Sequence, residues 1–330
     1  MTTSRPGGTR AKEVPLYAIK DNTIKIIGVD AGYGNIKTAN TIFATGITAY
    51  DHEPMFSGNI MAYEGKWYRI GEGHKAFNPD KTCDEDFRLL TYAAIASELA
   101  HHHLNQADVQ LAAGLPLTWT ARHRETFRSY LMENMDIHLR FNDVDYHFTL
   151  VGCNVFPQGY SALVPLIYYD NSKFTGTAVM ADIGNGTMDT LFLMNGKPDE
   201  NRCFTEELGV KQCVAAIRKE LSNRYALNAE GYIIQQVLLT GTAELEQPYL
   251  DLITGIARRY VTGIFDTLRS YGYDARAMRL FIVGGGGVLV RNFGQYDTSR
   301  TVIIDDLCAN AKGFEFLAYG LTWGEKRELR

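Results

Sequence analysis

The sequence lacks any apolar run close to the roughly 20 residues that are needed to span a bilayer. Its apolar stretch Leu280–Val290 is short, and four glycines interrupt it. The N-terminal segment MTTSRPGGTRAKEVP has no apolar core of the kind found in signal peptides. We therefore expect a cytoplasmic protein with no membrane partner.

Cysteine is also scarce, and its spacing forms no recognisable pattern. The chain has five cysteines, an odd number, and no two of them are spaced as CxxC. This argues against a disulfide framework and against a zinc ribbon, so we expect free thiols. His101, His102 and His103 are consecutive, and consecutive side chains of a helix point in different directions. We interpret them as a solvated helix end rather than a metal site.

An excess of positive charge is missing as well. The 33 Lys and Arg residues against 38 Asp and Glu residues give a formal net charge of −5. Such a balance disfavours direct wrapping of nucleic acid. The one local basic excess, at Arg5, Arg10 and Lys12, lies beside Pro and Gly residues, and we expect residues 1–22 to form a flexible arm. That arm is either a solubilising tail or a contact for DNA or a partner.

What the sequence does contain is an alternation of strand and helix patterns, with hairpin signals such as Asn142-Asp143. This alternation predicts an α/β protein with mixed sheets, and 330 residues suggest two domains. Apolar runs predict strands at Ile24–Val29, Thr38–Thr48, Glu64–Ile70, Val109–Ala113, Thr177–Ala181, Met188–Met194, Leu280–Val283 and Thr301–Ile304. Helical spacing predicts helices at Asp84–His101, Thr120–Met135, Pro157–Tyr168, Val210–Tyr225, Pro248–Tyr271 and Asn310–Leu321.

An acidic, glycine-rich turn follows the first buried strand. Glycines at such a position allow backbone N–H groups to approach and face a phosphate. Asp30 could hold a water of bound Mg²⁺, and Lys37 supplies a mobile positive charge. Taken alone, the segment Asp30–Lys37 is equally compatible with a simple hairpin turn that carries a surface lysine.

A second turn of the same kind, Asp182–Asp189, lies about 150 residues further on. It strengthens the interpretation of the first turn as a phosphate-binding turn. Two facing carboxylates would repel each other without a cation between them, and Mg²⁺ with a polyphosphate would remove that repulsion. A third element, Gly284–Gly287, follows a strand and leaves bare backbone suited to a base and ribose. A flexible loop is the alternative for this glycine run.

Other phosphate-binding motifs are absent. GxxxxGK[ST] occurs nowhere, which excludes a P-loop. Gly32-Tyr33-Gly34 does follow a strand, but Lys37 stands where a dinucleotide fingerprint needs Gly or Ala. The next segment also looks like strand rather than helix, so a Rossmann site is not expected.

Five segments, in order, resemble the motifs of the superfamily of actin, sugar kinases and heat-shock chaperones. They are the two turns, Phe281–Val288 as an adenosine motif, and Phe156–Leu163 and Ala309–Gly320 as connecting helices. Gly114-Leu-Pro116 and Pro157–Tyr160 look most like the bacterial actin-like proteins of plasmid segregation, the ParM/StbA group.

The resemblance implies an actin-like (ribonuclease H-like) α/β fold of two domains, with a nucleotide cleft between duplicated halves. Domain I would comprise residues 23–165 and the C-terminal helix 314–330, with a small insertion at about 40–108. Domain II would comprise residues 166–313.

It also implies roles for individual residues. The contacts to phosphates and to the waters of Mg²⁺ fall on Asp30, Lys37 and Asp182. The backbone donors of the first turn would be Gly32, Tyr33, Gly34 and Asn35. The roles of the second turn fall on Asp182, Gly184, Asn185, Gly186 and Thr187. Contacts to base and ribose fall on Gly284, Gly285, Gly286, Gly287 and Val288, with Glu207, Gly209 and Lys211 on the opposite wall. The attacking water would be positioned by Gln158, with Asn154 as the alternative.

By this resemblance the chain is expected to be a cytomotive filament that hydrolyses ATP or GTP and segregates plasmid DNA. Its acidic charge suggests that an adaptor protein bridges filament and DNA. A small-molecule kinase is the alternative, with Asp182 as its base. A chaperone-type ATPase is not expected, because only Gly324–Arg330 follows the last helix pattern.

Overall fold

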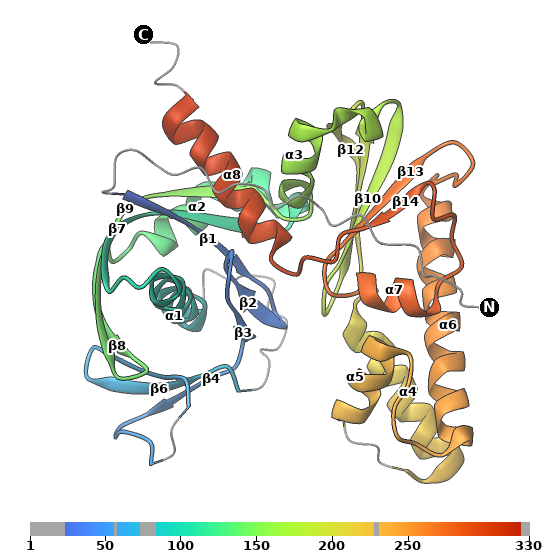
Figure 1. Ribbon diagram of the computed structural model, residues 1–330, viewed down its shortest axis with the longest axis horizontal. Helices are drawn as coiled ribbons and strands as arrows, with labels where there is room; N and C mark the ends of the chain where they lie inside the picture. Colours follow the sequence, from blue (N-terminus) through green and yellow to red (C-terminus); the bar gives the residue numbers. More distant parts are fainter. Residues whose placement is uncertain (1–23, 56–57, 73–83, 228–230, 325–330) are drawn as a thin grey trace, which may run out of the picture.

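The computed structural model describes residues 24–55, 58–72, 84–227 and 231–324, which form two sheets surrounded by helices (Figure 1). The N-terminal arm expected at residues 1–22 lies outside this range, as does Cys83. The cysteines within it, Cys153, Cys203, Cys213 and Cys308, are free thiols. Among the described residues, no helix has the length and apolar character that crossing a bilayer requires.

The larger sheet has nine strands in the order β3-β2-β1-β7-β9-β8-β5-β6-β4. They are β1 (Ile24–Ala31), β2 (Asn35–Lys37), β3 (Ile42–Ala44), β4 (Ile47–Tyr50), β5 (Ile60–Tyr63), β6 (Lys66–Ile70), β7 (Gln106–Leu115), β8 (Asp136–Phe141) and β9 (Val144–Pro157). The smaller sheet has five strands in the order β12-β11-β10-β13-β14. They are β10 (Thr177–Ile183), β11 (Met188–Met194), β12 (Lys197–Glu206), β13 (Arg279–Val283) and β14 (Thr301–Ile303).

Helices cover both sheets, and α8 runs across the larger one (Figure 1). The helices are α1 (Glu85–His101), α2 (Leu117–Leu131), α3 (Tyr160–Tyr169), α4 (Val210–Tyr225), α5 (Gly231–Thr240), α6 (Gln247–Ser270), α7 (Gly287–Phe293) and α8 (Ala309–Gly324), with a 3₁₀ turn at Asn171–Phe174. The consecutive histidines do lie at a helix end, because α1 ends at His101.

The two sheets contain the same five-stranded unit. In β3-β2-β1-β7-β9, β2 is antiparallel to both β3 and β1, whereas β1, β7 and β9 run parallel to one another. The order β12-β11-β10-β13-β14 repeats these directions strand for strand. The prediction of a mixed α/β fold with duplicated halves is therefore confirmed.

The central strands of both units are buried, as their continuous apolar sequences predict. Ile27 and Val29 of β1 are 2% and 1% exposed, and Val179 of β10 is fully buried. The β1 core includes α1, and the β10 core includes α4 and α6. Each acidic turn thus begins at the end of a rigid strand.

Glycines allow α8 to lie directly on β1 and on α3. A Cβ atom at Gly28 would stand 2.1 Å from the carbonyl oxygen of Ala311, and one at Gly313 would stand 2.0 Å from that of Ser161. The Gly28 N–H donates to the Glu315 side chain at 2.9 Å. Burial, and to a lesser extent the negative charge of Glu98, raises the pKa of Glu315 to about 8. The two predicted connecting helices are therefore in close contact.

Several predicted boundaries differ from the structure. The helix expected from Pro157 begins at Tyr160, because Pro157 still pairs with Leu115 as the last residue of β9. The strand expected at Thr38–Thr48 was wrong as one element, since β2 ends at Lys37 and a turn separates it from β3. The predictions did not include β12, α5 or α7. The division into domains at residues 165 and 313 stays a prediction.

Candidate functional site

Asp30 and Lys37 face each other across the first turn. Asp30 lies near the end of β1 and is paired in register with Lys37 of β2. The Lys37 Nζ atom is 3.4 Å from Oδ2 of Asp30, whose residue is 3% exposed. The Gly32 N–H closes the turn by donating to the carbonyl oxygen of Asn35 at 3.1 Å.

The second turn repeats this geometry. Asp182 of β10 is paired in register with Asp189 of β11, and the Gly184 N–H donates to the carbonyl oxygen of Thr187 at 2.9 Å. Equivalent positions of the two halves are 152 residues apart along the chain: position 30 corresponds to 182, and position 37 to 189. The difference between the halves is chemical, because Asp189 stands in the second turn where Lys37 stands in the first.

Negative charge dominates this pair of turns. Burial, followed by the charges of Asp189 and Asp30, raises the pKa of Asp182 to about 6. Burial would lower the pKa of Lys37, but the charges of Asp30 and Asp182 outweigh it and raise that pKa. Lys37 is therefore a permanent cation that carboxylates of both halves attract.

Gln158 reaches Asp30 from the turn between β9 and α3. Its Nε2 atom donates to Oδ1 of Asp30 at 2.6 Å, and its backbone N–H donates to the carbonyl oxygen of Leu115 at 2.8 Å. Since the amide nitrogen is occupied by Asp30, the amide oxygen is the end of the side chain that can accept a hydrogen bond from water.

Asn310, the second residue of α8, performs the matching task for Asp182 and was missed in the sequence. Its Nδ2 atom donates to Oδ2 of Asp182 at 3.1 Å, and its Oδ1 atom accepts the Gly159 N–H at 2.8 Å. The residue is 6% exposed. Gln158 and its neighbour Gly159 thus connect to the carboxylates of both halves, one directly and one through Asn310.

The backbone of the first turn also meets a side chain of the second. A Cβ atom at Gly34 would stand 3.0 Å from Cβ of Asn185, so only glycine fits there without a shift. We call the two turns with Gln158 and Asn310 the paired-loop site, comprising Asp30–Lys37, Asp182–Thr187, Gln158 and Asn310. Within it, Gly186 opens onto space that no protein atom fills within 4 Å of an added Cβ.

The start of α4 supports the second turn from behind. A Cβ atom at Gly209 would stand 2.4 Å from the carbonyl oxygen of Asn185, and the Lys211 N–H donates to that oxygen at 2.9 Å. Glu207, on the loop before α4, is exposed. The structure therefore places Gly209 and Lys211 against the second turn through backbone atoms, and their contact to base and ribose stays a prediction.

The glycine run also touches the second turn. Gly284 has φ +83°, and a Cβ there would stand 2.5 Å from Oδ1 of Asp182. Gly286 and Gly287 are buried where α7 begins, and Val288 is half-buried within α7. The bare backbone expected from four glycines is thus confined to Gly284 and Gly285, and Gly285 has open space around it.

Two predicted residues point elsewhere with their side chains. The Asn154 side chain lies on β9, where its Oδ1 atom accepts from Nε2 of Gln110 at 2.7 Å. The ring of Tyr33 packs edge-on against Phe87 of α1, with centroids 5.6 Å apart. The role expected of Tyr33 is that of a backbone donor, so the position of its ring does not bear on that role.

The fold of the chain is similar to that of known proteins. The family model of actin-like protein N-terminal domains matches residues 28–160, which include the first turn and Gln158. A crystal structure of the archaeal actin homolog Ta0583 in complex with ADP superimposes with a TM-score of 0.69 at 20% identity, covering 89% of this chain and 98% of that one. The chain has an actin-like fold.

Two further structures agree with the actin-like fold. Apo pSK41 ParM gives a TM-score of 0.70 at 15% identity, covering 91% of this chain and 98% of that one. A 15-stranded ParM filament from Clostridium botulinum gives 0.69 at 18% identity, covering 91% and 100%. No curated protein matches the chain. The resemblance indicated by the sequence motifs is confirmed at the level of the fold.

Proposed function

We propose that the chain binds ATP or GTP with Mg²⁺ at the paired-loop site, hydrolyses it slowly, and assembles into a filament in a nucleotide-dependent way. The observation that carries this proposal is the connection between the halves, where Gln158 bonds to Asp30 while its neighbour Gly159 bonds to Asn310, which in turn bonds to Asp182. A nucleotide bound there would contact both halves at once. Its hydrolysis could therefore change the relative orientation of the halves. Such a change would alter the contacts between subunits.

The residues of the site fit a magnesium nucleotide. Crowded carboxylates at Asp30, Asp182 and Asp189 create negative charge that a divalent cation would relieve, as the raised pKa of Asp182 indicates. Oxygen donors are what Mg²⁺ prefers, and it usually keeps several waters. Asp30 and Asp182 would hold the ion through such waters. Bound Mg²⁺ would supply charge neutralisation for the phosphates.

The protein groups have separate roles in this proposal. Lys37 binds phosphate oxygens as a point charge, and the N–H groups of both turns bind them through hydrogen bonds. Gln158 orients the attacking water with its amide oxygen, which suits a reaction that depends on positioning and electrostatics more than on proton removal. Gly284 and Gly285 offer accessible backbone to base and ribose, with Val288, Glu207, Gly209 and Lys211 nearby in sequence or space as weaker candidates.

Filament formation is proposed from the fold and from symmetry. One structural relative is described as a 15-stranded filament. A head-to-tail contact that does not close generates an open helix of subunits. We further infer a role in segregating plasmid DNA, in which a DNA-binding adaptor joins the filament to DNA, because a net charge of −5 disfavours direct binding. Tight, salt-sensitive binding of bare DNA by the purified chain would contradict the adaptor.

Release of inorganic phosphate, measured together with light scattering, tests the function. We expect phosphate release from ATP or GTP in the presence of Mg²⁺, with a rise in scattering that requires the nucleotide. Asp182 could instead act as the base of a small-molecule kinase, since its raised pKa of about 6 suits proton transfer near neutral pH. Nucleotide consumption that depends on an added sugar or acid, without a rise in scattering, would favour the kinase and contradict the filament.

A further inference from the structure

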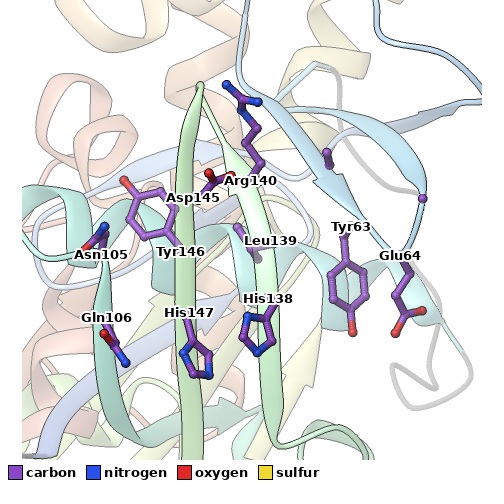
Figure 2. A pocket seen from close by; sticks show the side chains of 12 residues that line it. Tyr63, Glu64, Asn105, Gln106, His138, Leu139, Arg140, Asp145, Tyr146 and His147 are labelled. Carbon is purple, nitrogen blue, oxygen red and sulfur yellow. The ribbon is translucent and has the colours of Figure 1, made fainter.

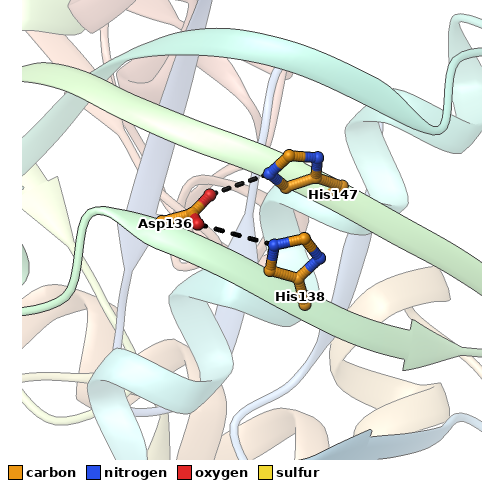
Figure 3. Close-up of side chains that lie close together, drawn as sticks. All are labelled: Asp136, His138 and His147. Atoms are coloured by element: carbon orange, nitrogen blue, oxygen red, sulfur yellow. Dashed lines mark hydrogen bonds and ion pairs between the residues drawn. The ribbon is translucent and has the colours of Figure 1, made fainter.

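A cluster of three metal-ligating side chains lies on the β8–β9 hairpin, away from the paired-loop site. Asp136 and His138 belong to β8, and His147 lies directly opposite His138 on β9. Their ligand atoms all lie within 4.8 Å of one another (Figure 3). The cluster is independent of the proposed nucleotide chemistry.

Strand periodicity explains why these side chains gather. Side chains two residues apart on a strand share a face, so Asp136 and His138 point the same way. His147, directly opposite His138 on β9, lies on that face as well. The alternate residues Ile137 and Phe148 are fully buried on the other face. The three candidate ligands therefore stand on a backbone that the core holds in place.

The interactions within the cluster show that the side chains already converge. Nε2 of His147 is 2.8 Å from Oδ1 of Asp136, and Nε2 of His138 is 3.5 Å from Oδ2 of the same carboxylate. The two imidazole rings are stacked, with centroids 3.9 Å apart. Ligands on a tetrahedral zinc ion, at about 2.0–2.1 Å from it, are roughly 3.4 Å from one another. Small side-chain rotations would bring the three atoms to that spacing.

We propose that Asp136, His138 and His147 bind a divalent transition metal of the zinc, cobalt or nickel class. Two imidazole nitrogens and one carboxylate oxygen suit these ions, whereas Mg²⁺ and Ca²⁺ prefer sites made of oxygen ligands. Three protein ligands leave at least one coordination position for water or an incoming group. The structure provides room for it, because both histidines line an open surface pocket of about 450 Å³ together with Tyr63, Asn105 and Gln106 (Figure 2).

Zinc binding to the full chain tests the proposal, by competition with a chromophoric chelator in buffer that contains excess Mg²⁺. The Mg²⁺ occupies oxygen-rich sites, so that zinc reports the histidine site. We expect one zinc ion per chain, and a loss of affinity of at least about tenfold in each of His138→Ala, His147→Ala and Asp136→Asn, since even outer-shell changes at metal sites cost that much. Visible absorption of bound Co²⁺ should change with the same variants, which identifies the residues as direct ligands.

His123→Ala is the matched control, because His123 is an exposed histidine on the neighbouring helix α2. This variant should bind zinc as the unmodified chain does. Circular dichroism should show that all variants remain folded, because Asp136, His138 and His123 are exposed and His147 is half-buried. The proposal is overturned if the double variant His138→Ala/His147→Ala binds zinc as tightly as the unmodified chain, or if His123→Ala weakens binding equally.

Discussion

Asp182 illustrates how a single residue of the site depends on pH. In the folded chain, burial and the charges of Asp189 and Asp30 raise the pKa of Asp182 to about 6, above the ordinary value of 3.8. The folded chain thus holds this proton more tightly than the unfolded chain does. This tighter proton binding adds to the free energy of unfolding. The contribution is complete below about pH 4 and is lost as the pH rises through about 6, so ionised Asp182 destabilises the nucleotide-free protein at neutral pH.

Asp182→Asn should therefore stabilise the nucleotide-free protein at about pH 8, by on the order of 1–2 kcal/mol, and change it little at about pH 4. Thermal unfolding at both pH values measures this. Asp108→Asn, at an exposed position on β7, is the control and should change neither melting temperature. A variant that is equally destabilised at both pH values would show that the repulsion does not exist.

Gln158 and Asn154 can be separated by experiment. Gln158→Ala should slow hydrolysis by at least about tenfold while nucleotide affinity changes by less than about threefold, because the residue positions water rather than binding phosphate. Asn154→Ala should leave the rate intact, since its amide bonds to Gln110. Single-turnover phosphate release and a nucleotide-binding titration measure the two quantities. The reverse pattern would assign the water to Asn154.

At this scale the sequence predicted several residues that the structure brings together, but not the bonds between them. Asp30, Lys37 and Asp182 were recognisable because each follows or faces a glycine turn at a strand end. Asn310 was missed because its partners, Gly159 and Asp182, are 151 and 128 residues away along the chain. A lone Asn at the start of a helix is usually interpreted as a local cap, and no local pattern reports such distant partners.

At the scale of elements, α3 and α8 pack directly against each other. Gly313→Ala would place a Cβ atom 2.0 Å from the carbonyl oxygen of Ser161, a backbone atom of α3 that has to move. We expect this variant to lose about 1–3 kcal/mol in the free energy of unfolding, as overpacking typically costs. Urea denaturation measures the loss.

Gly320→Ala, on the same helix, is the matched control for that variant. An added Cβ at Gly320 meets nothing within 4 Å, so the change should stabilise α8 by about 0.5–1 kcal/mol through helix propensity. Equal effects of the two substitutions would mean that the close contact between α3 and α8 carries no energetic weight.

Two of the elements that escaped prediction, β12 and α7, have local sequences that argue against their structure. β12, with the sequence KPDENRCFTE, is an edge strand and shows little of the apolar alternation that identifies a strand. α7 has seven residues and begins within the glycine run, where glycine propensity argues against a helix. Tertiary packing against Ile183 and Ile303, not local sequence, determines that helix start.

At the scale of the whole molecule, duplication explains the architecture. The same strand order and the same turn geometry recur in both sheets, and the sequence revealed this because the two turns have similar spacing. The chemistry has diverged at positions 37 and 189, which gives one lysine where perfect symmetry would place two acids or two lysines. In the proposed function, one half would offer a cation to phosphates, and the other would add negative charge that Mg²⁺ would neutralise.

Electron microscopy of the purified full chain with Mg²⁺, with and without ATP or GTP, tests the central claim most directly. If nucleotide binding drives assembly, we expect filaments with at least one of the two nucleotides and dispersed particles without nucleotide. Lys37→Met, which removes the cation of the site, should abolish the filaments at the same protein concentration. Dispersed particles under every nucleotide condition would contradict filament formation. Filaments that form equally well without nucleotide and in Lys37→Met would contradict its dependence on the nucleotide.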